Sequence, residues 1–277
     1  MFRMMVAAGL AAVFLVACGG GSGDAQPTAK ALTISMYGKP LVSATSGATA
    51  HAQLAAVVRA ASTPAAGASD AQATVQTLQD ALAARGVTAN VTAQVMDGTT
   101  LHQIVMGVDN GLPPTPDQFK TDPSEWMVVN FQLDDMVTPA SDPAQQAALK
   151  QFAQDLTVFA QRAAVSGKAV FAVRPIPTCD TQYSASAGLS SAMTQALVDG
   201  APIRFIGETG VSFSFGSGVA VPSTNSPGVD HFGADCRTPD AYVQNLVVQS
   251  VADSIAAGYK EAAGTPSAAS GASATGT

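Results

Sequence analysis

The sequence predicts an α/β protein with three layers, in which helices cover both faces of a mostly parallel five-stranded sheet. Short runs of apolar and β-branched residues alternate along the chain with longer stretches whose apolar residues recur at helical spacing. The run "EWMVVNFQL", residues 125–133, has a continuous apolar centre, as a strand buried on both faces requires. Strands that alternate with helices in this way form a parallel sheet with both faces covered.

The individual elements follow from these runs in chain order. The expected strands are residues 31–37, 87–96, 125–133, 168–177 and 201–208. The expected helices are residues 46–61, 69–85, 100–107, 141–166 and 238–259. Ser141 or Asp142 caps the fourth helix, with Pro143 in its first turn, and Thr238 or the residue before it caps the last helix, with Pro239 at its start. In such a sheet the functional groups gather at the carboxyl ends of the strands.

The first residues of the chain have the pattern of an export signal. Residues 1–17 combine an early Arg3, an apolar run and small residues, and the apolar run is too short to span a membrane. They end in "LVAC", which matches the bacterial lipoprotein box, so we expect cleavage that leaves Cys18 as a lipid-bearing N-terminus. The alternative is an ordinary signal peptide with an incidental cysteine. Gly19 after the cysteine favours the outer membrane, so we expect an envelope protein anchored there by lipid and facing the periplasm or the surface.

Composition divides the rest of the chain into a tether, one domain and a tail. Residues 18–30 begin with "CGGGSGD" and form a flexible tether after the lipidated cysteine. Residues 31–261 have the size of one domain. Residues 262–277 are small and polar, so they cannot bury a core and are expected to be disordered.

Charge and cysteine content exclude several kinds of partner. The net charge is −7, with 13 lysines and arginines and no basic cluster, which excludes nucleic acid as an expected partner. Apart from Cys18 there are two cysteines, Cys179 and Cys236, and in an oxidising compartment such a pair forms a disulfide; the alternative is two free thiols. The three histidines are widely spread and no metal-binding spacing is present, so we predict neither a metal nor another cofactor.

Four segments, taken in order, resemble the blocks of the SGNH (GDSL-type) hydrolases. They are "MYGKP" at 36–40, "ALAARGVTANVTAQVMDGTTLHQIVMG" at 81–107, "WMVVNFQLDDM" at 126–136 and "DCRTPDAYVQNLVVQSVADSI" at 235–255. The resemblance covers most of residues 31–260 and implies the flavodoxin-like strand order 2-1-3-4-5. It also implies acyl transfer, with a serine nucleophile, a histidine base, an aspartate that orients the base, and an oxyanion hole.

The first three blocks depart from the family at the reacting positions. Pro40 stands at the serine position and supplies neither a nucleophile nor an N–H for the oxyanion. Lys39 replaces the preceding aspartate, while the glycine of the second block is kept as Gly98. Asp134 stands for the asparagine of the oxyanion hole, and an ionised aspartate donates no hydrogen bond. Gln132 replaces a glycine two residues earlier.

The last block keeps an aspartate, Asp235, but has Thr238 where the family has its histidine, and threonine is not a base near neutral pH. Nucleophile, oxyanion side chain and base are therefore all replaced. We predict an SGNH-like domain without esterase activity that serves as a binding or scaffolding module. The resemblance makes cell-wall glycan, acylated polysaccharide or a partner protein the plausible ligands.

Two rival interpretations stay open. In the first, the chain is an active carboxylic-ester or acetyl-ester hydrolase with a rewired site, in which His231 is the base and Ser43 or Ser46 the nucleophile. In the second, the layers only resemble the family and the pocket lies elsewhere. Gly98 is expected to serve a turn, Asp235 to cap the last helix, and His102 to be structural or exposed.

Overall fold

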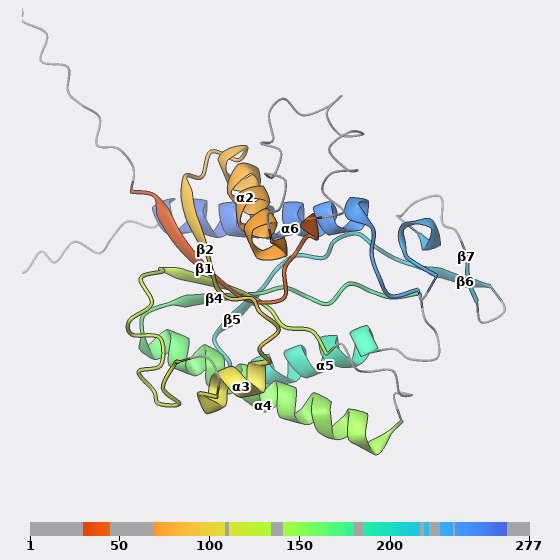
Figure 1. Ribbon diagram of the computed structural model, residues 1–277, viewed down its shortest axis with the longest axis horizontal. Coiled ribbons are helices and arrows are strands. Elements are labelled where there is room, and N and C mark those ends of the chain that lie inside the picture. The colour runs from red at the N-terminus through yellow and green to blue at the C-terminus, as the bar shows by residue number, and fades with distance from the viewer. Residues whose placement is uncertain are drawn as a thin grey trace, which may run out of the picture. The chain divides into compact units, whose positions relative to one another are not determined.

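The computed structural model describes residues 30–44, 69–108, 111–133, 141–179, 185–216, 219–221, 228–234 and 236–264. Five parallel strands form one sheet in the order β2-β1-β3-β4-β5 (Figure 1). Their bounds are Leu32–Gly38 for β1, Ala89–Val95 for β2, Trp126–Asn130 for β3, Ala169–Ala172 for β4 and Ile203–Phe205 for β5. The predicted α/β class, the parallel sheet and the flavodoxin-like strand order are confirmed.

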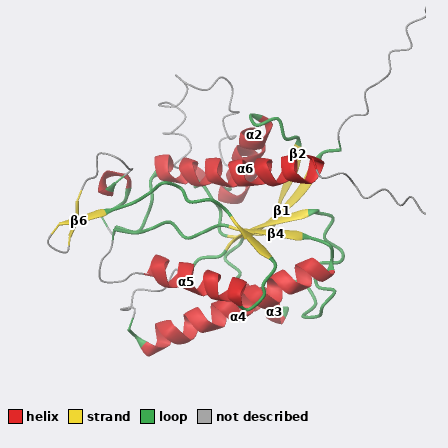
Figure 2. Cartoon of the chain, turned by 180° about the vertical axis from the view of Figure 1, so that it is seen from behind, coloured by secondary structure: helices red, strands yellow, loops and turns green. Residues whose placement is uncertain are grey.

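Helices cover both faces of the sheet (Figures 1 and 2). One face carries α2, Asp70–Ala83, and α6, Ala241–Gly264. The other carries α3, Leu101–Met106, α4, Pro143–Val165, and α5, Ala185–Val198. None of the described helices is long and apolar enough to cross a membrane.

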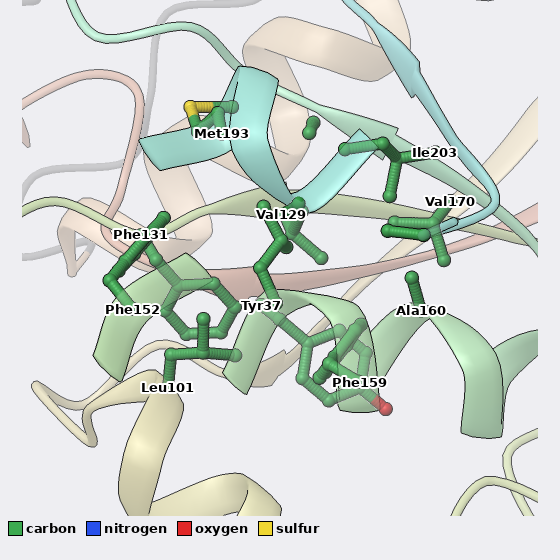
Figure 3. Packing of buried hydrophobic residues seen from close by; sticks show 14 of the residues in the cluster. Tyr37, Leu101, Val129, Phe131, Phe152, Phe159, Ala160, Val170, Met193 and Ile203 are labelled. Carbon is green, nitrogen blue, oxygen red and sulfur yellow. The ribbon is translucent and has the colours of Figure 1, made fainter. Parts of the chain in front are cut away.

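Each face of the sheet has its own apolar core. On the α4 side the core is built around aromatic rings: Phe159 packs against Tyr37 and Phe119, with ring centroids 5.5 and 4.7 Å away. Figure 3 shows Tyr37 and Phe159 among the buried side chains of this core. Tyr37 comes from β1, an interior strand of the sheet, and is fully buried. On the other face, Val248 and Ile255 of α6 are also fully buried. Because the inner strands are buried on both faces, their sequences are continuous apolar runs.

Strands β3, β4 and β5 each end at least three residues earlier than the sequence predicts. β3 ends at Asn130 because its neighbour β1 turns away at Gly38, which has a φ of +94°. β4 ends at Ala172, although the N–H of Val173 still donates to the carbonyl oxygen of Val129 at 2.9 Å. The prolines that follow have no N–H to donate, so the sheet ladder cannot continue there.

Four elements were not predicted, and one prediction falls outside the described residues. The unpredicted elements are α5, the antiparallel pair β6, Ser214–Gly216, and β7, Val219–Val221, and the short 3₁₀ helix η1, Val229–His231. The helix expected at 46–61 lies outside the described part of the chain.

The prediction for the start of the last helix was wrong. α6 begins at Ala241, and Asp240 caps it, since its Oδ1 accepts from the N–H groups of Tyr242 and Val243 at 2.9 and 3.1 Å. Pro239 cannot begin the helix because it forms an isolated bridge with Phe232. At its other end α6 runs to Gly264, beyond the predicted start of the tail.

A buried polar network fastens the segment before β3 to the sheet. The Asp122 carboxylate accepts from the hydroxyl of Tyr37 at 2.7 Å and from that of Ser35 at 2.9 Å. The Nζ of Lys168 donates to the carbonyl oxygens of Asp122 and Ser124. Burial raises the pKa of Asp122, but the hydrogen bonds from Tyr37, Ser124 and Ser35 outweigh burial and bring the pKa below its ordinary value. Burial, followed by the contact with Asp122, raises the pKa of Tyr37.

The expected disulfide between Cys179 and Cys236 is present, with the two Cα atoms 5.0 Å apart. It joins the segment after β4 to the loop before α6. Both cysteines therefore lie on the carboxyl-end side of the sheet, which is the side where this fold class places its sites.

Candidate functional site at the carboxyl edge of the sheet

A cavity of about 670 Å³ opens at the carboxyl ends of β1, β3 and β4. Its walls come from the turn after β1, the first residue of α2, the residues at and after the end of β3, the segment after β4, the first turns of α5, and the start of α6 with the residues before it. Its polar and charged lining residues are Lys39, Ser43, Asp70, Asn130, Gln132, Arg174, Thr178, Ser186, Arg237, Thr238 and Gln244.

The turn after β1 is held rigidly against the end of β3. The N–H of Lys39 donates to the carbonyl oxygen of Asn130 at 2.7 Å, and the Asn130 side-chain amide donates back to the Lys39 carbonyl at 2.9 Å. The amide of Gln132 donates to Asn130 Oδ1 at 2.8 Å. A Cβ on Gly38 would lie 2.4 Å from the Asn130 carbonyl oxygen, so only glycine permits this approach. These contacts fix Lys39 and Pro40 at the mouth of the cavity.

Gln244, in the first turn of α6, connects two walls. Its Oε1 accepts from the N–H of Ser43 at 3.0 Å, and its Nε2 donates to the carbonyl oxygen of Pro239 at 3.1 Å. The segment after Pro40 is thereby bound to the loop that carries Thr238. Thr178 and Arg237, which adjoin the two bridged cysteines, complete this side of the cavity.

A second cavity, of about 300 Å³, opens beside the first. Lys39, Gln132 and Leu133 line both cavities, so the two are neighbours along the edge of the sheet. The second cavity is also lined by Gly98, by His102 of α3 and by residues of α4.

His102 is held by a buried carboxylate of α4. Its Nδ1 lies 3.0 Å from Oδ2 of Asp155, whose other oxygen accepts from the side-chain amide of Gln151 at 3.1 Å. The Asp155 side chain is 7% exposed, whereas that of His102 is 54% exposed. The pair joins α3 to α4 and presents the imidazole at the rim of the second cavity. Sequence analysis treated His102 as structural or exposed and did not find this partner.

The structure brings several predicted site residues together. Pro40, Thr238 and Ser43 line the larger cavity, although Thr238 is far from the other two in sequence. Gly98 lines the smaller cavity and has a φ of +98°, so it does occupy a turn that favours glycine. Asp134, Asp235, Ser46 and Cys18 lie outside the described residues.

His231 lies apart from these residues. Its Nδ1 is 2.8 Å from Oδ2 of Asp240, and its ring stacks on Tyr242 with centroids 4.5 Å apart. It does not line either of the two cavities. Among the described residues, its hydrogen-bonding side-chain partner is a carboxylate and not a serine hydroxyl.

The two arginines that line the larger cavity were not among the site residues predicted from the sequence. Arg174 and Arg237 come from segments far apart in sequence and meet only because the sheet edge and the disulfide bring them together. Arg174 Nη1 lies 3.3 Å from Oε1 of Glu208, whose side chain is 83% exposed, and the guanidinium stands over the ring of Phe205 at 4.7 Å. The sequence indicates these arginines only through their positions: Arg174 lies near the end of a predicted strand, and Arg237 lies just before the last predicted helix.

Comparison with known proteins identifies the fold. No protein-family model matches the sequence, and no curated protein sequence matches it. Among solved structures, a mutant of an acetyl-xylooligosaccharide esterase from Geobacillus is similar, with a TM-score of 0.50 and 10% identity over 81% of this chain and 94% of that one.

Two further solved structures are similar over comparable lengths. A family 3 carbohydrate esterase from Clostridium thermocellum has a TM-score of 0.49 and 11% identity over 83% of this chain and 99% of its own. A putative lipolytic protein of the G-D-S-L family from Desulfitobacterium hafniense has a TM-score of 0.45 and 9% identity over 80% of this chain and 98% of its own. The fold that the sequence blocks imply is confirmed: the chain has an SGNH/GDSL-like fold.

Proposed function

We propose that this protein is a lipid-anchored module of the cell envelope whose SGNH-like domain binds a polysaccharide without hydrolysing it. The observation that carries the proposal is the composition of the larger cavity. Pro40 and Thr238, the residues aligned with the family's nucleophile and base, line one cavity at the carboxyl edge of the sheet. Proline offers no attacking group, and threonine does not accept a proton near neutral pH.

The cavity nevertheless suits a polar ligand. Amide and hydroxyl side chains line it, and several are fixed in place by hydrogen bonds to neighbouring main-chain or side-chain atoms. Side chains that are already ordered lose little entropy when a ligand binds. Retained shape together with replaced reacting groups supports binding over turnover.

The second candidate function is ester hydrolysis at a rewired site, which is the reaction of the structurally similar esterases. Ser43, the candidate nucleophile, supports this second function because it lines the larger cavity. The candidate base, His231, is less well positioned for this reaction, since it is paired with Asp240 and does not line the larger cavity. A serine nucleophile needs its base within hydrogen-bond reach, so the binding function is favoured.

A paired labelling experiment separates the two functions. The full chain, extracted in detergent, is exposed to a fluorophosphonate probe and to short-chain acyl esters. It is compared with a variant carrying Lys39→Asp, Pro40→Ser, Asp134→Asn and Thr238→His. We expect no labelling or turnover by the natural chain and labelling of the restored variant. Labelling of the natural chain that is lost in a Ser43→Ala variant would overturn the proposal in favour of the rewired hydrolase.

The lipid anchor has its own test. Cells grown with a radiolabelled fatty acid should yield a labelled protein in the membrane fraction. Cys18→Ser should remove the label and release the chain from membranes, because acyl chains supply the anchoring free energy. The matched control is Cys179→Ser with Cys236→Ser, which should keep the label. A Cys18→Ser chain that stays labelled would contradict the anchor.

A further inference from the structure

We propose that the ligand is an acidic polysaccharide, with sugar carboxylates held by the basic residues of the larger cavity and the chain lying across Lys39 into the smaller one. This rests on the proposed binding function and names the class of its ligand.

Most of the described charged residues that line the larger cavity are basic, whereas the chain as a whole carries a net negative charge. The protein carries a net charge of −7, yet three of its 13 lysines and arginines, Lys39, Arg174 and Arg237, line this one cavity. Among the described residues that line it, the one carboxylate is that of Asp70, which accepts from the N–H of Ala44 at 2.7 Å. Basic side chains gathered in a concave site, on a chain that otherwise repels anions, favour an anionic ligand.

Arginine selects among anions by shape. A planar guanidinium forms two parallel hydrogen bonds with a carboxylate, which an ammonium group does not. Arg174 is engaged by Glu208, but that glutamate is largely exposed and such pairs contribute little in water. A ligand carboxylate can therefore replace Glu208 at small cost. The guanidinium also stands over the Phe205 ring at 4.7 Å, a cation–π contact that favours this position of the side chain.

The remaining polar groups suit sugar hydroxyls. Gln132 donates to Asn130, and Asn130 donates to the Lys39 carbonyl oxygen in the turn after β1, which fixes the orientation of both amides. A side-chain amide has two donor and two acceptor positions, and the bonds described for Asn130 use one of each. Both amides thus present oriented donors and acceptors at the cavity wall, as recognition of a neutral hydroxyl requires.

The two cavities together are longer than one sugar ring. Because Lys39, Gln132 and Leu133 line both cavities, the two lie side by side along the sheet edge and together form the proposed binding groove, from the Gly98 turn after β2 to Arg174 after β4. It passes the ends of four neighbouring strands, β2, β1, β3 and β4. At about 4.8 Å between strands, these ends extend over roughly 14 Å. A polymer segment fills such a groove better than a single sugar does.

The test compares one polymer with and without its charges. The full chain in detergent is titrated with a defined oligogalacturonate and with its fully methyl-esterified form, which keeps every sugar hydroxyl. We expect binding of the acid that weakens as salt is raised, and binding of the ester about ten- to a hundredfold weaker. Arg237→Gln and Lys39→Gln should each weaken binding of the acid about tenfold or more.

Matched variants distinguish binding at this site from a general effect of the protein's charge on affinity. Arg204→Gln removes the same charge from a residue that pairs with Glu261 on the surface, outside both cavities, and should leave affinity unchanged. Lys39→Arg keeps the charge and should retain binding, which guards against a variant that merely fails to fold.

Several outcomes would overturn the inference. Equal affinity for acid and ester would reject the acidic ligand while leaving a polysaccharide-binding function in place. Competition by inorganic sulfate or phosphate at the same concentration as the oligomer would show a site for small anions instead. An equal effect of Arg204→Gln and Arg237→Gln, or no binding of either oligomer, would also reject it. The labelling experiment judges the absence of catalysis separately.

Discussion

The main-chain N–H of Cys179 donates to the carbonyl oxygen of Cys236 at 3.1 Å, so the two cysteines are joined by a hydrogen bond as well as by a disulfide. Thr178 and Arg237, their sequence neighbours, both line the larger cavity. One covalent bond thus fixes the spacing of two cavity walls that come from distant parts of the chain.

Removing this bridge should destabilise the domain. The disulfide joins residues 57 positions apart, and the chain-entropy model then gives about 4 kcal/mol. We expect the double variant Cys179→Ala, Cys236→Ala to lose about that much free energy of unfolding, measured by urea titration without reductant. The Cys18→Ser variant is the control and should match the natural chain. A loss below about 1 kcal/mol would mean that the native packing alone holds the two segments.

Gly38→Ala should destabilise more than a matched glycine substitution. At Gly38 the new Cβ meets main-chain atoms of Asn130 at 2.4 and 2.7 Å, and φ is +94°. Strain and overpacking together predict a loss of about 2–5 kcal/mol. Gly86 has a φ of +77° with open space around it, so Gly86→Ala should cost about 1–2 kcal/mol. Thermal or urea unfolding of both variants measures the difference, and equal losses would exclude the contact with Asn130 as a cause.

Asp122 should make stability fall in acid. Its pKa is lowered in the folded state, and an unfolded aspartate titrates near 3.9, so the unfolded chain binds more protons in that range. The stabilisation is therefore complete above about pH 4 and is lost as pH falls through the folded-state pKa. Asp122→Asn should cost about 1–3 kcal/mol at pH 7 and less at pH 3. Urea unfolding at several pH values tests this, and an undiminished acid dependence in the variant would contradict it.

The side chain of Asp240, and not that of Thr238, should stabilise the last helix, α6. Asp240→Ala removes the acceptor of two N–H groups and should cost about 1 kcal/mol, while Thr238→Ala should change stability by about 0.5 kcal/mol or less. Asp240→Asn keeps the cap but loses the charge beside His231, so it should stay close to the natural chain. A destabilised Asp240→Asn variant would assign the effect to the histidine pair instead. Urea unfolding distinguishes these cases.

The sheet was predictable because burial on both faces leaves a direct mark on composition. The apolar centre of β3 and the regular alternation of strands with helices predict parallel strands, and the blocks around Gly38 and Gly98 predict their order. The strand ends were less predictable because they depend on the neighbour. β3 ends where β1 turns at Gly38, so the end of β3 depends on the sequence of another segment.

α5 was missed because its buried and exposed faces differ little in composition. Leu189, Ala192, Met193 and Ala196 do recur at helical spacing and all are buried. Alanines and serines on the other positions give little contrast between the faces, so the pattern does not stand out.

The chemistry of the site was harder to predict than its location. Pro40 and Thr238, which the resemblance assigns to one site, both line the larger cavity at the carboxyl edge of the sheet. The pairs His102–Asp155 and His231–Asp240 could not be predicted, since each depends on how two separate elements meet. The same is true of the two arginines, which come into one cavity only through the folded loops.

The place of β1 in the sheet has a consequence for how the chain acquires its structure. β1 is the first strand to be synthesised but lies inside the sheet, where Leu32 pairs with Ala89 and Ile34 with Trp126. Long stretches of chain must close into loops before these pairs form, which slows folding. A nascent chain that stops before β3 leaves one edge of β1 without its partner. Such delayed folding suits a polypeptide that must cross a membrane in the unfolded state, as its first 17 residues predict.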